Sequence, residues 1–320
     1  MQVSVIIPTY NRADIIRDAL ESVLAQSYQD FEILVVDDGS SDNTCEVVAS
    51  IGSSKIRFLR SERNCGCSAA YNRGIKEAAG NFIAFLDSDD IWEPGYLERE
   101  VDFLSRHPEV GVVFCDTEIR GPEMHVSSIV SLMDAFPRFL QKNTKASEYV
   151  VDAREMYLCL LQEVPIKPSA TMVRREVFSK AGVFDEQWPS GTDWDLFLRM
   201  SRQTNFGYID QALVTQRHRS DATHRRFYEK DKMFLLGQFS KEKATLTGDH
   251  EALKGVNRGM GALYNSLGWY YLEGGQNKKA LSTYFTGYRE TLYPKLLRKL
   301  ATGLFRTMFH GDSRTAAQKK

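Results

Sequence analysis

A short apolar run that ends in a cluster of carboxylates constrains this chain more than any other stretch. Phe82-Ile83-Ala84-Phe85-Leu86 has the composition of a buried strand in a parallel sheet, and Asp87-Ser88-Asp89-Asp90 follows directly. Carboxylates packed so closely repel one another unless a cation lies among them. Magnesium and manganese take oxygen ligands and often bridge to phosphates. The stretch therefore predicts a metal–diphosphate site at the carboxyl end of a strand, where open α/β sheets bind ligands. The alternative is an acidic helix cap, with Asp89 or Asp90 beginning a helix near Trp92.

Strand and helix patterns alternate on both sides of this stretch. Short β-branched or apolar runs predict strands, and longer segments with an apolar stripe predict helices between them. Such alternation implies a mostly parallel sheet with helices on both faces. The predicted strands are 3–8, 31–36, 56–59, 82–86 and 110–115, and the predicted helices are about 13–26, 41–50, 68–79 and 96–107.

Polar residues follow three of these strands. Thr9 and Asn11 come after the first strand, Asp38 after the second, and Asp87 after the fourth. Because the carboxyl ends of parallel strands share one edge of a sheet, we expect these side chains to line a common binding site.

The later part of the chain is less regular. We interpret 118–150 as a variable insertion or a loop over the site, with a short helix at 131–141 as an alternative. After His224 the pattern changes to long helices without strand signals, through about Phe309. The remaining predictions are strands at 170–173, 206–209 and 213–218, helices at 152–162 and 175–181, and a helix that starts at Thr192 or Asp193.

Composition limits the class of protein. The net charge of -1 gives no global basic footprint for nucleic acid. The five cysteines match no zinc signature, so we expect reduced thiols in a cytoplasmic protein. We find neither a signal peptide nor an apolar run long enough to cross a bilayer.

Four motifs follow one another along the chain. They are Val5-Ile6-Ile7-Pro8-Thr9-Tyr10-Asn11, Val35-Val36-Asp37-Asp38-Gly39-Ser40-Ser41-Asp42-Asn43-Thr44, Phe85-Leu86-Asp87-Ser88-Asp89-Asp90 and Thr192-Asp193-Trp194-Asp195-Leu196. In this order and spacing they resemble the family-two inverting glycosyltransferases with the GT-A fold. The resemblance covers roughly residues 2–220, and the stretch from Asn64 through Gly66 to Asn72-Arg73-Gly74 also follows the family pattern.

The resemblance implies an α/β fold of the GT-A type, with a mostly parallel sheet flanked by helices and an α-helical C-terminal extension. We expect a catalytic domain at 1–224, with a nucleotide-binding half at about 1–116 and an acceptor half at about 117–224. Residues 225–320 are expected to form a helical C-terminal region.

The resemblance also implies a nucleotide-sugar donor, commonly a UDP-sugar, and a divalent metal, manganese or magnesium. Asp38 matches the residue that hydrogen-bonds the base, Asp89 the direct metal ligand with Asp87 beside it, and Asp193 the catalytic base. His218 is a further metal candidate, or else a surface histidine in a basic loop. The residues expected to contact the nucleotide are Pro8, Thr9, Tyr10, Asn11, Asp38, Asn64, Arg73, Asp87 and Ser88, and those expected near the acceptor are Trp188, Thr192 and Trp194.

Two positions depart from the family pattern. Thr192 stands where an acidic residue usually precedes the base, and Tyr71 stands where relatives often carry arginine. The loss of a neighbouring charge lowers the expected pKa of the base. A phosphate contact at Tyr71 is in doubt, with Arg63 or Arg73 as substitutes.

Other functions were weighed against this one. A dinucleotide-dependent dehydrogenase is disfavoured because Pro8-Thr9-Tyr10-Asn11 stands where a Gly-x-Gly-x-x-Gly turn would follow the first strand. A nucleotidyltransferase is disfavoured because it would need a basic, glycine-rich triphosphate loop near the N-terminus, and we find none in the sequence. An inactive sugar-nucleotide-binding scaffold remains an alternative, against which Asp87, Asp89 and Asp193 together argue.

The C-terminal region carries a second hypothesis. From Arg289 to Lys320 the chain has eight Lys/Arg and two Asp/Glu, and a predicted helix at 295–309 is amphipathic. Docking on an anionic membrane surface, where a lipid-linked acceptor would lie, competes with packing on the catalytic domain or a partner subunit. The expected acceptor is a polysaccharide or a lipid-linked glycan, and the expected location is cytoplasmic, on the inner face of the membrane if the helix docks there.

Overall fold

The computed structural model describes residues 2–122, 124–140, 147–188, 192–217 and 224–301. Contacts divide the chain into two compact units. The first, which we call the sheet unit, comprises Met1–Leu160 and Val164–His224, and the second, the helical unit, comprises Leu161–Glu163 and Arg225–Lys320.

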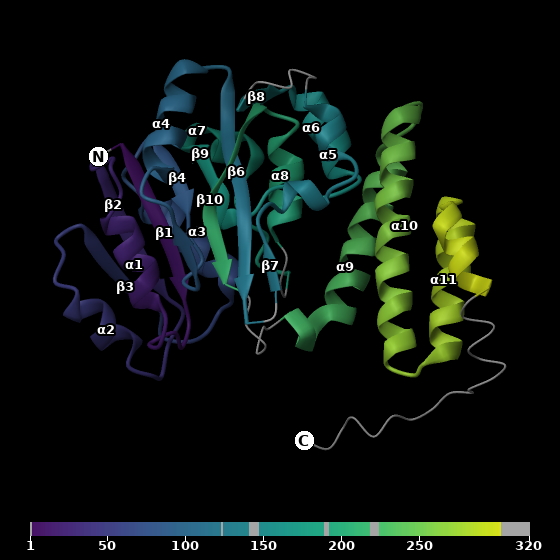
Figure 1. Cartoon of the computed structure of the whole chain (residues 1–320), viewed down its shortest axis with the longest axis horizontal. Coiled ribbons are helices and arrows are strands. Elements are labelled where there is room, and N and C mark those ends of the chain that lie inside the picture. Colours follow the sequence, from purple (N-terminus) through teal and green to yellow (C-terminus); the bar gives the residue numbers. More distant parts are fainter. Residues whose placement is uncertain (1, 123, 141–146, 189–191, 218–223, 302–320) are drawn as a thin grey trace. The chain divides into compact units, whose positions relative to one another are not determined.

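Ten strands of the described residues form one sheet in the sheet unit (Figure 1). The order β3-β2-β1-β4 is parallel throughout, as the alternation of strands and helices predicts. Beyond β4 the sheet is mixed, because β9 runs antiparallel to both β4 and β6. The α/β fold class is therefore confirmed, with an uninterrupted run of parallel strands in the N-terminal part of the sheet, from β3 to β4. The strands are β1 (Val3–Thr9), β2 (Phe31–Asp37), β3 (Ile56–Arg60), β4 (Phe82–Phe85), β5 (Asp90–Trp92), β6 (Val110–Gly121), β7 (Met124–Val126), β8 (Glu148–Val151), β9 (Thr171–Arg174) and β10 (Asn205–Arg217).

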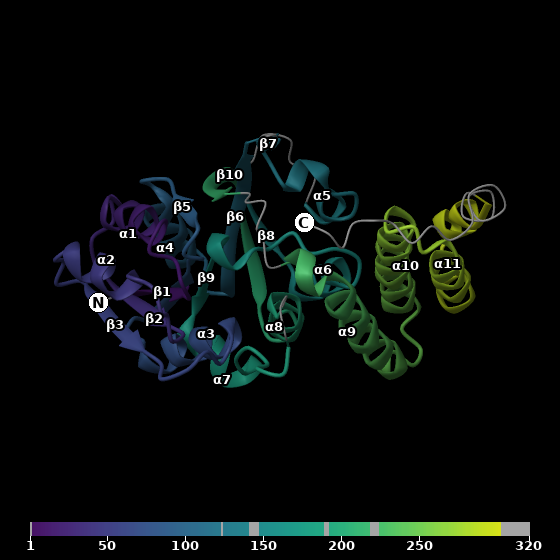
Figure 2. The same cartoon turned by 90° about the horizontal axis from the view of Figure 1, so that it is seen from below.

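Helices cover both faces of this sheet. Side chains along β1 alternate between the two faces of the sheet. Val3, Val5 and Ile7 belong to the core cluster that includes α1 and α4, whereas Ile6 packs on the other face, against Gly74 of α3. A Cβ at Gly74 would lie 2.4 Å from Ile6 Cγ2, so glycine lets α3 approach the sheet. Figure 2 shows α1 and α4 on one side of β1 and α3 and α7 on the other. The helices are α1 (Ile16–Leu24), α2 (Thr44–Ser50), α3 (Cys67–Glu77), α4 (Tyr96–Arg106), α5 (Phe136–Phe139), α6 (Ala153–Leu160), α7 (Arg175–Ala181) and α8 (Asp193–Met200), with 3-10 turns at Val130–Leu132 and Pro168–Ala170.

The segment 118–150 is more ordered than the sequence suggested. β6 continues to Gly121 and pairs with β7, and β8 pairs with β10. Of the helix considered at 131–141, the described residues form only the short turn of α5 and the 3-10 turn before it. The two strands expected at 206–209 and 213–218 are one strand, β10, whose register shifts around Ala212. A β-bulge there breaks the sequence pattern into two apparent strands without ending the ladder.

The helical unit contains three long helices, α9 (His224–Thr245), α10 (His250–Glu273) and α11 (Asn277–Thr291). The Asp249 side chain caps α10 by accepting from the Ala252 N–H. α10 and α11 pack closely because Gly268 leaves room for the ring of Tyr284. The chain is helical again over 294–301, and the rest of the helix expected at 295–309 lies outside the described residues. Among the described helices, none combines the length and apolar character that a bilayer crossing requires.

Candidate functional site

The loops that follow β1, β2 and β4 meet at one edge of the sheet. The Asp38 N–H donates to the Thr9 carbonyl at 2.9 Å, and the Leu86 N–H donates to the Ile6 carbonyl at 3.0 Å. These bonds extend the parallel ladders past the last paired residues. The polar residues expected to share an edge therefore lie in adjacent loops.

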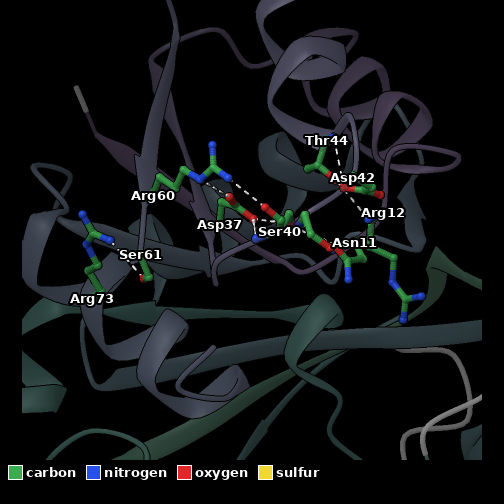
Figure 3. A network of polar contacts seen from close by, with 10 residues as sticks. Asn11, Arg12, Asp37, Ser40, Asp42, Thr44, Arg60, Ser61 and Arg73 are labelled. Atoms are coloured by element: carbon green, nitrogen blue, oxygen red, sulfur yellow. Dashed lines mark hydrogen bonds and ion pairs between the residues drawn. The ribbon is translucent and has the colours of Figure 1, made fainter. Parts of the chain in front are cut away.

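Side chains tie the loop after β1 to the loop after β2 (Figure 3). The Asn11 N–H donates to Ser40 Oγ at 2.8 Å, and the Ser41 N–H donates to Asn11 Oδ1 at 2.8 Å. Asp42 accepts from the Ala13 N–H at 3.0 Å and from the Thr44 hydroxyl at 2.5 Å. Asn11 has a left-handed φ of 52°, which asparagine tolerates better than most residues. Asn11 thus holds the two loops together through both its backbone and its side chain.

The loop after β2 is also fixed from within. Asp37, which is fully buried, accepts from the Ser40 N–H and hydroxyl. Arg60 donates to the Ser40 carbonyl at 2.8 Å. Gly39 has a φ of 78°, and a Cβ there would lie 2.9 Å from the carbonyl carbon of Arg63. Only glycine suits both the conformation and the close approach of the loop after β3.

Backbone N–H groups surround the Asp38 carboxylate. Cys65 and Gly66 each donate to one of its oxygens at 2.8 Å. Each carboxylate oxygen can accept a second hydrogen bond. Nearby, Thr9 Oγ1 is buried with no hydrogen-bond partner among the described residues. A carboxylate with spare acceptor capacity and an unsatisfied hydroxyl are suited to binding a polar ring or a ribose.

The loop after β4 contains two carboxylates, Asp87 and Asp90, whose pKa values are raised. Tyr71 donates its hydroxyl to Asp87 Oδ1 at 2.5 Å. Ser169 accepts from the Asp87 N–H at 3.0 Å and donates to Asp90 Oδ2 at 2.6 Å. Tyr71 also stacks on Phe184, with ring centroids 4.8 Å apart. Residues from α3 and from the turn before β9 therefore position this loop.

Burial and like charges act on this loop together. Desolvation and the negative charge of Asp89, with a smaller contribution from Asp193, raise the pKa of Asp87 to about 6, although the Tyr71 hydroxyl opposes the shift. Desolvation and Asp87 likewise raise the pKa of Asp90. Such a group of acids is unfavourable by itself and becomes favourable when a cation offsets the charge.

Asp89 lies closer to solvent and has cationic neighbours. Arg12 approaches its carboxylate at 3.8 Å, and Arg217 donates to its backbone carbonyl at 2.6 Å. The same Arg217 guanidinium contacts Asp18 and the carbonyl of Ile15. Arg217 thus links the end of β10, the start of α1 and the loop that carries Asp89.

The carboxylates fit a divalent cation by their chemistry. Within the part of the chain that the structure describes, no three His, Cys, Asp or Glu side chains form a complete metal cage. Magnesium-type sites that take phosphate oxygens as ligands need only one or two protein carboxylates. Asp87 and Asp89 would supply those, whereas His218 lies outside the described residues.

Asp193, the first residue of α8, lies near the same group. Desolvation and the charges of Asp87, Asp38, Asp193 and Asp89 raise the pKa of the Cys67 thiol, so all four carboxylates lie within electrostatic range of this residue. Asp195 is turned elsewhere, because it pairs with Arg199 at 2.7 Å one helical turn along. Asp193 is therefore the acid of this motif that can reach the shared edge.

The residues expected near the acceptor are largely buried. Trp188 and Trp194 are 6% and 3% exposed, with rings 6.4 Å apart, and Trp194 donates to the Leu160 carbonyl. Thr192 is 9% exposed. Their burial favours a packing role for both tryptophans, and an acceptor contact through any of the three stays a prediction.

The remaining predicted nucleotide contacts are spread around the edge. Tyr10 is 45% exposed, while Pro8 and Ser88 are buried. Asn64 is exposed in the loop that holds Asp38. Arg73 donates to Ser61 at 3.1 Å (Figure 3), so its expected phosphate contact stays a prediction.

Several residues of the site were missed by sequence reasoning. Ser169 and Arg217 contact the loop after β4 although they lie 82 and 128 residues away in the sequence, and no local sequence pattern predicts these contacts. Tyr71 was noted only as a departure from arginine, and its hydroxyl bond to Asp87 was not foreseen. Asp42 and Thr44 carried a signal, since their cap-type sequence precedes a helix.

Comparisons with known proteins give a family match and several sequence relatives. A model of "Glycosyl transferase family 2" matches residues 4–180. The glycosyltransferase RP339 of Rickettsia prowazekii is 32% identical over 224 residues, which are 69% of this chain and 66% of that protein. The UDP-Glc:alpha-D-GlcNAc-diphosphoundecaprenol beta-1,3-glucosyltransferase WfgD of Escherichia coli is 29% identical over 241 residues, which are 74% of this chain and 86% of WfgD.

A solved structure shares the fold. The mannosyltransferase PcManGT of Pyrobaculum calidifontis, in complex with GDP-Man and Mn2+, aligns with a TM-score of 0.58 at 20% identity, over 97% of this chain and 81% of that one. Some relatives are much longer: the match covers 34% of a glycosyltransferase of Rickettsia felis and 34% of one of Rickettsia conorii.

Proposed function

Since the chain belongs to glycosyl transferase family 2, we propose that it transfers a sugar from a UDP-sugar to an acceptor hydroxyl with inversion at the anomeric carbon. One observation carries the proposal. Asp38, the pair Asp87 and Asp89, and Asp193 come from three separate segments: the loops after β2 and β4 meet at the polar edge of the sheet, and the charge of Asp193 reaches Asp87 there. This reaction needs a donor, a cation and a catalytic base at one point. Asp38 would bind the donor, Asp87 and Asp89 would bind the cation, and Asp193 would act as the catalytic base.

The nucleotide lies between the loops after β1, β2 and β3. Asp38 keeps acceptor capacity beyond its bonds to Cys65 and Gly66 and would accept from the N3–H of uracil. Thr9 Oγ1, buried without a partner among the described residues, would bond the nucleoside. WfgD is named for a UDP-glucose donor, whereas PcManGT is bound to GDP-Man. The experiment must therefore distinguish a uracil from a guanine nucleotide in the donor.

Asp89, with Asp87 beside it, would hold a magnesium or manganese ion together with the donor diphosphate. The bound ion would offset the charge that develops on the departing diphosphate. Tyr71 and Ser169 hold Asp87, and Arg217 holds the backbone of Asp89, so the carboxylates are oriented before the donor arrives.

Asp193 acts as the base. It takes the proton of the acceptor hydroxyl while that oxygen attacks the anomeric carbon, and the bond from this carbon to the diphosphate oxygen breaks with its electron pair leaving on UDP. Attack from the face opposite the leaving group inverts the configuration in one displacement. No covalent enzyme intermediate is required.

The name of one relative supports the proposed acceptor class. WfgD is named for an acceptor linked to diphosphoundecaprenol. We assign this chain to polysaccharide or lipid-linked glycan assembly on the cytoplasmic face of a membrane. Its five free cysteines support a reducing compartment.

Donor turnover tests the proposal directly. Release of UDP from a panel of UDP-sugars is measured with and without Mn2+, alongside GDP- and dTDP-sugars. We expect metal-dependent release from one or a few UDP-sugars, and a loss of at least about a hundredfold in Asp193→Asn. Asp195→Asn is the matched control and should remain active, because Asp195 pairs with Arg199. Tight UDP binding without turnover of any sugar would instead indicate an inactive scaffold.

A further inference from the structure

One face of α11 is apolar and partly exposed, although it lies outside the face that α11 packs against α10. Ala280, Tyr284, Gly287 and Thr291 are buried and repeat every three or four residues, which marks the face toward α10. Figures 1 and 2 show α10 and α11 side by side within the helical unit.

A second stripe runs along α11 at the same spacing. Leu281, Phe285 and Tyr288 lie one helical turn apart, and Leu292 follows where the helix ends. Phe285 is 58% exposed and Leu292 is 69% exposed. Isolated exposed apolar residues need no explanation, but a stripe at helical spacing on one face indicates a binding surface. We call these four residues the α11 stripe.

Leu292 carries a second sign that the stripe is retained for binding. It ends the helix in the left-handed conformation, with φ 54°. Glycine or asparagine usually occupies such a position, because a side chain with Cβ is strained there. The Leu292 backbone N–H closes the helix by donating to the Tyr288 carbonyl, whereas its strained and exposed side chain points to a role outside the fold of this unit.

The charge around the stripe selects the partner. Lys278 and Arg289 fall on the same side of α11 as Leu281 and Phe285, at spacings of three and four residues. Glu290, the one acidic residue of α11, is drawn to the α10 side, where it accepts from the Tyr264 hydroxyl at 2.7 Å. The described residues that follow α11, through 301, add Lys295, Arg298 and Lys299 and no acidic residue.

We propose that the α11 stripe docks the protein on an anionic lipid surface. Aromatic and aliphatic side chains flanked by basic residues are the pattern of helices that lie in a membrane interface. A protein partner could use the apolar residues, but it would leave the one-sided positive charge unexplained. The inference deepens the proposed function, on which the lipid-linked acceptor rests, by naming the surface that brings the enzyme to that acceptor.

Vesicle sedimentation of the full chain tests the proposal. One set of vesicles contains phosphatidylcholine alone, and the other an equal mixture of phosphatidylcholine and phosphatidylglycerol. We expect binding to the anionic vesicles only, weakened by added salt. The pair Phe285→Ser and Leu292→Gly should bind about tenfold more weakly. Lys278→Gln with Arg289→Gln should lose about as much on the anionic vesicles.

The controls separate docking from folding and from catalysis. Met233→Ser removes an exposed apolar residue from α9, 53% exposed, and should bind vesicles as the native sequence does. Leu292→Gly alone should unfold at the same or a higher temperature, because it relieves the left-handed strain. UDP binding, measured on the same variants, should be unchanged; if UDP does not bind at all while vesicle docking depends on the stripe, only the proposed function fails.

Three outcomes would overturn the docking proposal. The native chain could fail to bind anionic vesicles, or the Phe285→Ser and Leu292→Gly pair could bind as tightly as the native chain. The chain could also form a dimer in solution that this pair of substitutions dissociates, in which case the stripe is a subunit interface.

Discussion

The loops after β2 and β4 bring acidic residues to the same edge of the sheet. The loop after β2 stabilises its ionised carboxylates through hydrogen bonds, whereas the loop after β4 destabilises the ionised form of its own. In the loop after β2, Asp38 accepts from the N–H groups of Cys65 and Gly66. Although burial opposes it, hydrogen bonds from Thr44 and Ala13 lower the pKa of Asp42. In the loop after β4, desolvation and neighbouring acids raise the pKa of Asp87 to about 6.

The difference separates a preorganised loop from a loop that stores unfavourable charge. Hydrogen bonds from backbone groups stabilise an ionised carboxylate. Removing a carboxylate from the loop after β2 should therefore destabilise the fold. Crowded carboxylates cost stability until a cation binds, so removing one from the loop after β4 should stabilise the metal-free protein. Function retained at the expense of stability is common at active sites.

The largest expected effect is in the loop after β2. Asp38→Ala leaves the N–H groups of Cys65 and Gly66 without their acceptor and should lower the free energy of unfolding by about 3 kcal/mol. Urea unfolding followed by tryptophan fluorescence measures this, since Trp92, Trp188 and Trp194 are buried in the sheet unit. Cys65→Ala is the control, because its backbone N–H is kept. An Asp38→Ala variant as stable as the native chain would contradict the preorganised loop.

Asp87→Asn should have the opposite sign. Because the folded state raises the pKa of Asp87 above its ordinary value, the native chain loses stability as pH rises through about 6. At about pH 8 the variant should therefore be more stable than the native chain by up to about 2 kcal/mol, and the gain should vanish below about pH 4. Urea midpoints of the metal-free proteins across this range test the sign. A variant that is less stable at every pH would remove the contrast between the loops.

Tyr71→Phe tests the hydroxyl that moderates this charge. The Tyr71 hydroxyl lowers the pKa of Asp87, so its removal should raise that pKa further while the stacking on Phe184 remains. Under the proposed function, metal-dependent UDP binding requires ionised Asp87. As the pH falls, the variant should therefore lose this binding at a pH up to about one unit higher than the native chain does. Tyr208→Phe, which removes a hydroxyl bond to Asp210, should leave the midpoint in place. An unchanged pH midpoint in Tyr71→Phe would show that the hydroxyl does not act on Asp87.

Asn11 is expected to show the smallest effect. Asn11→Ala loses the bond to the Ser41 N–H and places a strained residue at φ 52°, which should cost about 1 kcal/mol or somewhat more. Asn11→Gly loses the same bond but suits the conformation, so it should cost less than the alanine variant. Urea unfolding of both variants provides the comparison. An alanine variant no less stable than the glycine variant would argue against strain at this position.

The sequence predicted the parts of the fold whose signals are local. β1, β2 and β4 are apolar runs that end in polar residues, and the structure has them within one or two residues of the expected bounds. The polar edge followed from parallel strands alone. The short antiparallel strands β7 and β8 were missed, because three or four residues carry no period and their pairing is set by tertiary contacts.

The sequence identified the acids of the candidate site, whose roles stay predictions, but not the residues that hold these acids in place. Asp38, Asp87 and Asp89 were identified from motifs, whereas Ser169 and Arg217 act on the loop after β4 across long stretches of chain. Pairings of that kind depend on the assembled sheet. The same holds for Trp194, whose indole bonds the Leu160 carbonyl and is buried, a role that its place in an acceptor motif did not reveal.

Calorimetry of UDP binding, with and without Mn2+, tests the central claim that the crowded loop is a metal–diphosphate site. The account predicts that the native chain binds UDP tightly only with the metal, and that Asp89→Ala abolishes the metal-dependent part while Asp195→Ala preserves it. Equal binding with and without Mn2+, or metal-dependent binding that survives in Asp89→Ala, would contradict it.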